Sequence, residues 1–220
     1  DPTISGTFPL VYTFGTGSCL TRDTLIVIVN PLPVVDAGNN FAQCISAGNS
    51  TKVGVPVGGT WSGNGISATG VFNPTTAGAG THVLTYTYTN PATGCSNSDN
   101  ITATVYPLPV VNAGADLFLC NQPIPVNLTG SPAGGTWTGS GITNPSGVFT
   151  PSIIGNFPLV YTYTNANGCT KTDTLVAHVG NPSNANAGLD SNVCINAPNV
   201  NFTGSPAGGT WTGLGITSGG

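Results

Sequence analysis

Six cysteines are the residues of this 220-residue chain whose type and spacing point most directly to chemistry. Grouped thiols either form disulfides in an oxidising compartment or bind zinc. No Cys-x-x-Cys pair and no neighbouring histidine supports zinc, so we predict disulfides. The cysteines recur in two series, with steps of 76 and 74 residues: Cys19, Cys95 and Cys169, and Cys44, Cys120 and Cys194.

The spacing leaves more than one disulfide pairing open. A pairing at the constant spacing of 25 residues, such as Cys95 with Cys120, is rejected because the extended chain between them would hold the two far apart. We predict Cys44–Cys95 and Cys120–Cys169, each within one repeat and on neighbouring strands. A cysteine at the end of the first strand can lie too far along the sheet to reach a cysteine at the start of the last strand, so Cys44–Cys169 is the fallback. Cys19 and Cys194 are expected to have partners outside the chain.

No catalytic constellation is found among the titratable residues. General acid–base catalysis needs carboxylates or histidines held together, whereas the seven aspartates are spread one per landmark, and His82 and His178 occupy unrelated repeat positions. We therefore predict that the chain is not an enzyme and has no cofactor. Calcium at the joints between repeats, near Asp36 or Asp116, is the one metal considered, although few carboxylates are available.

Internal repetition decides how the chain is organised. Tryptophan occurs three times, always in Gly-Gly-Thr-Trp, and other motifs keep the same period, which indicates tandem copies of one module. We predict an N-terminal half-repeat at 1–30, complete repeats at 31–106 and 107–180, and a C-terminal half-repeat at 181–220. The three tryptophans, expected to anchor the cores, are Trp61, Trp137 and Trp211.

Each complete repeat is predicted to be an all-β immunoglobulin-like sandwich, with the modules arranged in line as a filament. Residues 83–89 and 101–105 alternate with period two, and short extended segments such as 51–57 are separated by Gly and Pro turns. No segment has useful helical periodicity. The positions expected to face the core on the last strand are Leu25, Val27 and Val29, Ile101, Ala103 and Val105, and Leu175, Ala177 and Val179, with Tyr86, Tyr88, Tyr161 and Tyr163 as further anchors.

Composition excludes several partner classes. Only 5% of the residues are charged and the net charge is −4, so no basic patch exists for nucleic acid. No apolar run is long enough to span a membrane. A hydrophobic content of 39%, in alternating patterns, argues against disorder. A neutral surface rich in Thr, Asn, Ser and Gly is expected to respond little to salt.

The two half-repeats admit two explanations. Asp1-Pro2-Thr3 aligns with Asn73-Pro74-Thr75, so residues 1–30 match the second half of a repeat, and 181–220 match the first half. The chain is then a window cut from a longer array, or half-repeats of successive chains complete each other as in donor-strand fibres. We favour the window, because unpaired half-sandwiches would expose edges and core.

An ordered set of motifs resembles a known group. Asn-Ala-Gly-x-Asp, Gly-Gly-Thr-Trp-Thr-Gly-x-Gly-Ile and Leu-Val-Tyr-Thr-Tyr-Thr-Asn-Ala-Asn-Gly-Cys resemble the PKD-like and immunoglobulin-like tandem repeats of giant Bacteroidota surface proteins, including gliding-motility adhesins and other type IX secretion cargo. The resemblance covers the whole chain. It implies an extracellular filament tethered to the outer membrane that contacts surface glycans, other cells or identical filaments. Asp23-Thr24-Leu25 and Asp173-Thr174-Leu175 also match an O-glycosylation motif of that phylum, at Thr24 and Thr174.

The expected function is a stalk or shaft of a secreted surface adhesin or fibre that mediates attachment or gliding, whose immediate neighbours are other modules of one long chain. The alternative is an array of carbohydrate-binding modules accessory to a polysaccharide-degrading enzyme. Exposure of the tryptophans separates the two, because glycan binding needs exposed aromatics and the shaft needs them buried.

Overall fold

The computed structural model describes residues 3–181 and 183–216 and confirms an almost entirely β structure. Its contacts divide the chain into two compact units, one of residues 1–110 with 164–171, the other of residues 111–163 with 172–220. Each unit is described by itself. In the described residues, no helix is long and apolar enough to cross a membrane.

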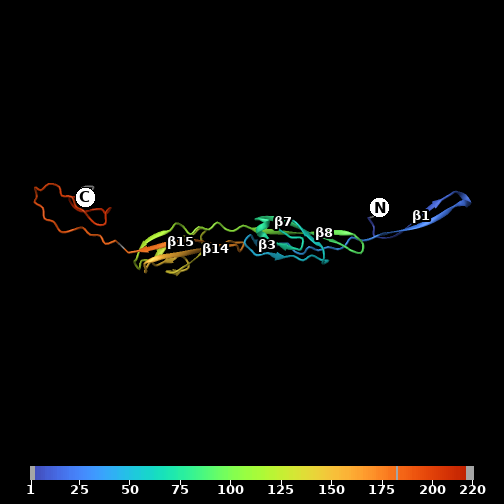
Figure 1. Cartoon of the computed structure of the whole chain (residues 1–220), viewed down its shortest axis with the longest axis horizontal. Helices are drawn as coiled ribbons and strands as arrows, with labels where there is room; N and C mark the ends of the chain where they lie inside the picture. Colours follow the sequence, from blue (N-terminus) through green and yellow to red (C-terminus); the bar gives the residue numbers. More distant parts are fainter. Residues whose placement is uncertain (1–2, 182, 217–220) are drawn as a thin grey trace. The chain divides into compact units, whose positions relative to one another are not determined.

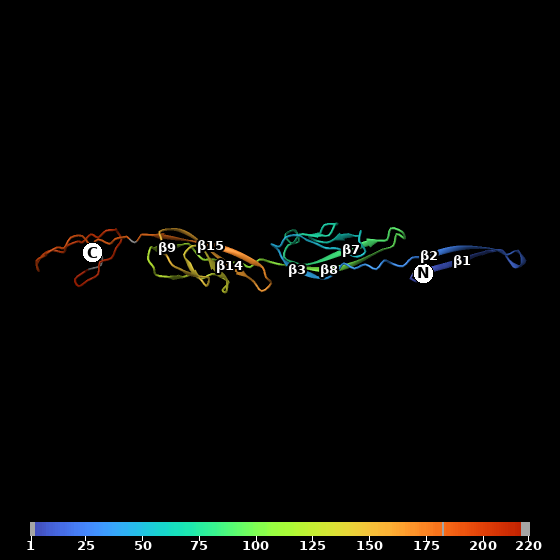
Figure 2. The ribbon, with the colours of Figure 1, turned by 90° about the horizontal axis from the view of Figure 1, so that it is seen from below.

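The first complete repeat forms an immunoglobulin-like sandwich in the first unit. Its larger sheet has its first strand parallel to its last, and the other neighbours are antiparallel. The smaller sheet pairs two short strands. In spatial order, the larger sheet is β3 (Phe41–Cys44), β8 (Ser96–Tyr106), β7 (Gly80–Thr89) and β5 (Thr60–Ser62), and the smaller is β4 (Ser50–Thr51) with β6 (Val71–Phe72) (Figures 1 and 2).

The larger sheet of the second complete repeat has the same topology, again with its first strand parallel to its last, and the smaller sheet has a third short strand. The repeated architecture follows from the repeated sequence. The larger sheet is β11 (Thr136–Thr138), β14 (Gly155–Thr164), β15 (Thr170–Gly180) and β9 (Leu117–Cys120), and the smaller is β10 (Val126–Asn127), β13 (Val148–Phe149) and β12 (Ile142–Asn144) (Figure 2).

Two local predictions need correction. The strand expected at 51–57 is reduced to β4 and an isolated bridge between Asp36 and Val55, because Pro56 has no N–H for a ladder. One helical turn, α1 (Pro74–Ala77), was not expected. Asn73 caps it by accepting the amides of Thr75 and Thr76, and Pro74 occupies its first turn, where a missing N–H costs nothing.

The cores of the complete repeats agree with the alternation in the sequence. Trp61 and Trp137 are 5% and 2% exposed, and each indole packs beside a tyrosine of the neighbouring long strand. Tyr88 and Tyr163 pack against these cores but are only partly buried. The last-strand residues predicted to face inward are buried in both complete repeats: Ile101, Ala103, Val105, Leu175, Ala177 and Val179.

The half-repeats differ from this pattern. The N-terminal half-repeat contains a hairpin of β1 (Gly6–Phe14) and β2 (Thr21–Val29), joined through a turn with the 3-10 segment η1 (Gly17–Cys19). Leu25, predicted to face a core, is exposed, and Val27 and Val29 are only half-buried. In the described part of 181–220 there is no strand, only a bridge between Asn186 and Ser205. Within the residues that the structure describes, neither half-repeat encloses a core.

The disulfide that forms is Cys44–Cys169, with Cα atoms 5.6 Å apart, so the predicted pairs Cys44–Cys95 and Cys120–Cys169 are wrong and the fallback pairing is correct. Cys44 lies beside Tyr106 at the end of β8, whereas Cys95 directly precedes the start of β8. At about 3.3 Å per residue, the eleven residues from Cys95 to Tyr106 put roughly 36 Å between these positions.

The bond joins one member of each of the two cysteine series. Cys44 is a strand-end cysteine, as are Cys120 and Cys194 by alignment, and Cys169 is a hairpin-loop cysteine, as are Cys19 and Cys95. The bridge joins the strand-end cysteine of one repeat to the hairpin-loop cysteine of the next. The other four cysteines, all within the described residues, are unpaired.

Candidate functional site

The Asp/Asn-Ala-Gly motif forms a connector between the first segment of a repeat and its last strand. In the first complete repeat, Asp36 accepts the Gly38 amide at 2.7 Å, and the Ala37 amide donates to the Asp99 carboxylate at 2.9 Å. The amides of Ala37 and Asn100 hold the pKa of Asp99 below its ordinary value. The second complete repeat is built the same way, with Ala113 donating to Asp173 at 2.8 Å.

A second polar link lies three residues beyond the alanine link of each connector. The Asn40 side-chain oxygen accepts the Thr102 amide at 2.7 Å, and Asp116 accepts the Val176 amide at 2.8 Å. Asn40 stands where the pattern Asn-Ala-Gly-x-Asp has aspartate. Its amide oxygen accepts the same type of backbone amide bond as the carboxylate of Asp116, so the contact is kept.

These links bear on the calcium hypothesis. One carboxylate oxygen of Asp36 and one of Asp116 already accept a backbone amide. Across the residues described, no group of three or more His, Cys, Asp or Glu side chains lies close enough to hold a metal ion. Calcium at the joints therefore stays a prediction without a ligand set to support it.

Tyr86 lies in a socket formed by Gly54, Pro56, Gly59 and Trp61, which we call the tyrosine socket. The Tyr86 hydroxyl donates to the Pro56 carbonyl at 2.6 Å and accepts the Gly59 amide at 2.8 Å, while its ring lies 5.1 Å from that of Trp61. A Cβ at Gly54 or Gly59 would strike this ring. Both glycines are therefore required by the close approach of the tyrosine.

The second complete repeat contains the same socket. Tyr161 donates to the Pro132 carbonyl and accepts the Gly135 amide at 2.8 Å, and its ring lies 5.0 Å from Trp137. The tyrosines and tryptophans were predicted as core anchors, but the hydroxyl contacts were not. The recurring Pro-x-Gly-Gly-Thr-Trp string was the signal that could have located them.

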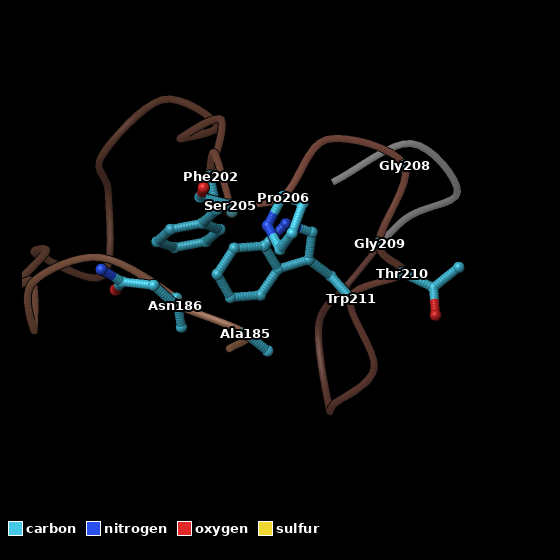
Figure 3. A pocket seen from close by; sticks show the side chains of 11 residues that line it. Ala185, Asn186, Phe202, Ser205, Pro206, Gly208, Gly209, Thr210 and Trp211 are labelled. Atoms are coloured by element: carbon cyan, nitrogen blue, oxygen red, sulfur yellow. The ribbon is translucent and has the colours of Figure 1, made fainter. Parts of the chain in front are cut away.

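The C-terminal half-repeat has the same socket residues without the tyrosine. Pro206, Gly209 and Trp211 line a pocket of about 350 Å³. Figure 3 shows the rings of Phe202 and Trp211 facing one another beside Pro206, and their centroids are 5.4 Å apart. Trp211 is only half-buried, so the prediction that it anchors a closed core fails in this part of the chain.

A second pocket, of about 490 Å³, surrounds the strand-end cysteine Cys120. Cys120 lies opposite Gly180 in parallel register, as Cys44 lies opposite Tyr106. His178 lines this pocket and is half-buried. Its ring stacks on Phe118 at 4.8 Å and bonds Asn156 at 2.8 Å.

The remaining predicted site residues lie apart from these pockets. Thr24 and Thr174 are both exposed, which suits modification, although the Asp173 of one motif is already engaged by Ala113. O-glycosylation stays a prediction. His82 bonds the Gly78 carbonyl at 3.0 Å.

Comparison with known proteins identifies no family, because no family model and no curated protein matches the chain. Solved structures that match include tandem Ig repeats of Dlar, at 15% identity over 68% of this chain and 98% of that one, with a TM-score of 0.29. Sidekick-1 immunoglobulin domains 1–4 match at 16% identity over 82% and 60%, with a TM-score of 0.29. Mouse protocadherin-24 EC1–3 matches at 10% identity over 81% of each chain, with a TM-score of 0.28.

At these identities and TM-scores the matches say nothing about function, and the assignment of the fold rests on the chain's own sheets. Those sheets define a tandem immunoglobulin-like repeat protein. Its disulfide indicates an extracellular location, because such bonds persist in oxidising compartments.

Proposed function

We propose that this chain is a non-enzymatic structural segment, a stalk or shaft, of an extracellular surface fibre or adhesin. The observation that carries the proposal is the Cys44–Cys169 disulfide, which joins two consecutive repeats across 125 residues of sequence. A binding or catalytic module acts through a site within one module, and that action does not depend on a covalent bond between consecutive repeats. In a filament under tension, the bridge gives successive repeats a second covalent connection besides the backbone.

The burial of the aromatics favours this role over carbohydrate binding. A glycan-binding face needs exposed aromatic rings, but Trp61 and Trp137 are enclosed in their cores. Trp211 is half-buried in a pocket against Phe202 rather than on a flat surface. The carbohydrate-binding alternative has no other tryptophan to use.

The finer assignment rests on the sequence resemblance. It supports a Bacteroidota adhesin exported by type IX secretion, tethered to the outer membrane, with repeats in line and with glycans, other cells or identical filaments as partners. The exposed Thr24 and Thr174 suit the glycoprotein character that the same resemblance implies.

Small-angle X-ray scattering of the oxidised chain tests the shaft role against the double variant Cys44→Ser/Cys169→Ser. A cross-linked joint should narrow the distribution of intramolecular distances relative to the variant. Identical scattering from the two proteins would contradict the proposal. Affinity electrophoresis in gels containing soluble polysaccharides tests the alternative, and retardation that Trp211→Ala abolishes would favour glycan binding.

A further inference from the structure

Polar side chains occupy inward positions of the first complete repeat that are apolar in the second. The strand registers, and two backbone amides that donate to aligned glycine carbonyls, match three positions of one repeat with three of the other. The first complete repeat has Gln43, Ser50 and Lys52 where the second has Leu119, Val126 and Leu128. Since the apolar set fits the same backbone, the polar set needs a physical reason of its own.

Gln43 and Ser50 both point between the two sheets. Gln43 lies opposite Val105 in the pairing of β3 with β8, and Val105 is buried. Ser50 lies opposite Phe72 in the pairing of β4 with β6, and Phe72 is also buried. Side chains directly opposite one another on paired strands share a face of the sheet. The side-chain nitrogen of Gln43 and the hydroxyl oxygen of Ser50 are accordingly enclosed, and neither bonds another atom of the described structure.

Lys52 does not supply the partner that these two atoms need. Its ammonium nitrogen lies 3.2 Å from the centroid of the Phe41 ring, which is a cation–π contact. The Phe41 ring also meets Phe72 edge-on, with 5.3 Å between the ring centroids. Burial lowers the pKa of Lys52, so the surroundings of its amine are partly shielded from solvent.

The path of the chain brings the two enclosed atoms to the same part of the interior. Because side chains alternate along a strand, Gln43 shares one face of β3 with Phe41. Ser50 shares a face with Lys52, which directly follows β4. The contact between Phe41 and Lys52 joins the two outer positions of this connection. The two inner positions, Gln43 and Ser50, therefore face one another beside the loop 45–49.

We propose that one ordered water molecule bridges the Gln43 side-chain amide and the Ser50 hydroxyl inside the first complete repeat. A buried polar atom without a partner destabilises a fold, and ordered water is the common partner where no protein atom is within reach. Water both donates and accepts, so it satisfies the hydroxyl and either end of the amide. The second complete repeat has Leu119 and Val126 at these positions, which offer a water no hydrogen bond.

A bridging water makes the two side chains act as a unit. Replacing one of them with the apolar residue of the second repeat removes half of the water's anchorage and leaves the other polar atom without a partner. Replacing both gives the dry interior that the second repeat already has. If no water were bound, each single replacement would instead remove one unpaired polar atom and stabilise the repeat. The sign of the single-variant effect therefore decides between the two cases.

Hydrogen exchange of the oxidised full chain measures this effect in Gln43→Leu, Ser50→Val and the double variant. Amides of β8 report the opening of the first complete repeat, and amides of β15 in the second are the internal control. We expect each single variant to raise the opening constant of β8 by about tenfold, the effect of leaving one buried polar group unpaired. The double variant should return to within about threefold of the parent chain, because coupled residues are not additive. Slower exchange in the single variants, or effects that add in the double variant, would overturn the proposal.

A crystal structure of the oxidised chain locates the water directly. We expect one density peak within about 2.7–3.2 Å of both the Gln43 side-chain amide and the Ser50 hydroxyl. A soak in sodium bromide separates water from a halide, because Lys52 nearby carries positive charge and bromide scatters anomalously. An anomalous peak at the site, a direct bond between the two side chains, or a dry gap between them would each contradict the inference.

The inference goes beyond the shaft role and does not depend on it. A first repeat without the water would leave the Cys44–Cys169 bridge intact, and the scattering experiment tests that bridge alone.

Discussion

Stretching the chain from its two ends measures what the Cys44–Cys169 bridge contributes. In the oxidised protein the 125-residue span between the two cysteines cannot extend, because force passes directly through the disulfide. At about 3.5 Å per extended residue, that span hides roughly 440 Å of contour length. Reduction, or Cys44→Ser with Cys169→Ser, releases it.

Single-molecule force spectroscopy checks this value. The bridge encloses β4 to β8 of the first complete repeat and β9 to β14 of the second. β3 and β15 lie outside the bridged span and can be pulled from their sheets in either state. We expect the total contour length on full unfolding to be longer by about 440 Å in the reduced protein. A Cys95→Ser/Cys120→Ser control should keep the shorter length. Equal lengths with and without reductant would refute the assigned connectivity.

Three further outcomes follow from the described contacts. Tyr86→Phe leaves the Gly59 amide and the Pro56 carbonyl without their partner, so chemical denaturation should show a loss of about 1–3 kcal/mol in unfolding free energy. The folded-state pKa of Asp99 is lowered from 3.8. The stabilisation from its ionised carboxylate is therefore present above the unfolded pKa and is lost as the pH falls through the lower folded pKa. Asp99→Asn should reduce the pH dependence of the unfolding free energy in that window. EDTA should leave the melting temperature unchanged, because no group of three or more His, Cys, Asp or Glu side chains in the described residues could hold a metal ion, and a clear drop would support calcium at the joints.

Sequence reasoning performed best where one strand had one buried face. The alternation around Ile101 and Leu175 depends on local period alone, and both residues face the core. It also located the tryptophans of the complete repeats. The helical turn after Asn73 was missed because four residues carry no periodicity, although an Asn cap followed by proline was a usable signal.

The disulfides were mispredicted for a reason that lies in tertiary structure. Cys44 and Cys95 are both near β8, and only the parallel register of β3 places Cys44 at the far end of that strand. The tyrosine socket was not predicted for a similar reason. A hydroxyl contact between Tyr86 and Pro56 joins residues 30 positions apart, and no local pattern reports it.

Equivalent residues with unequal burial show what a repeat specifies by itself and what its neighbours supply. Leu10 and Leu84 occupy the same place in hairpins of the same register, yet only Leu84 is buried. Apolar alternation and the turn therefore suffice to form the hairpin, but a core also needs the sheet that carries the indole. Burial of apolar side chains supplies most of the stability of a domain this small. The hairpin thus leaves Leu10 and Tyr12 exposed, whereas the first complete repeat buries their counterparts Leu84 and Tyr86.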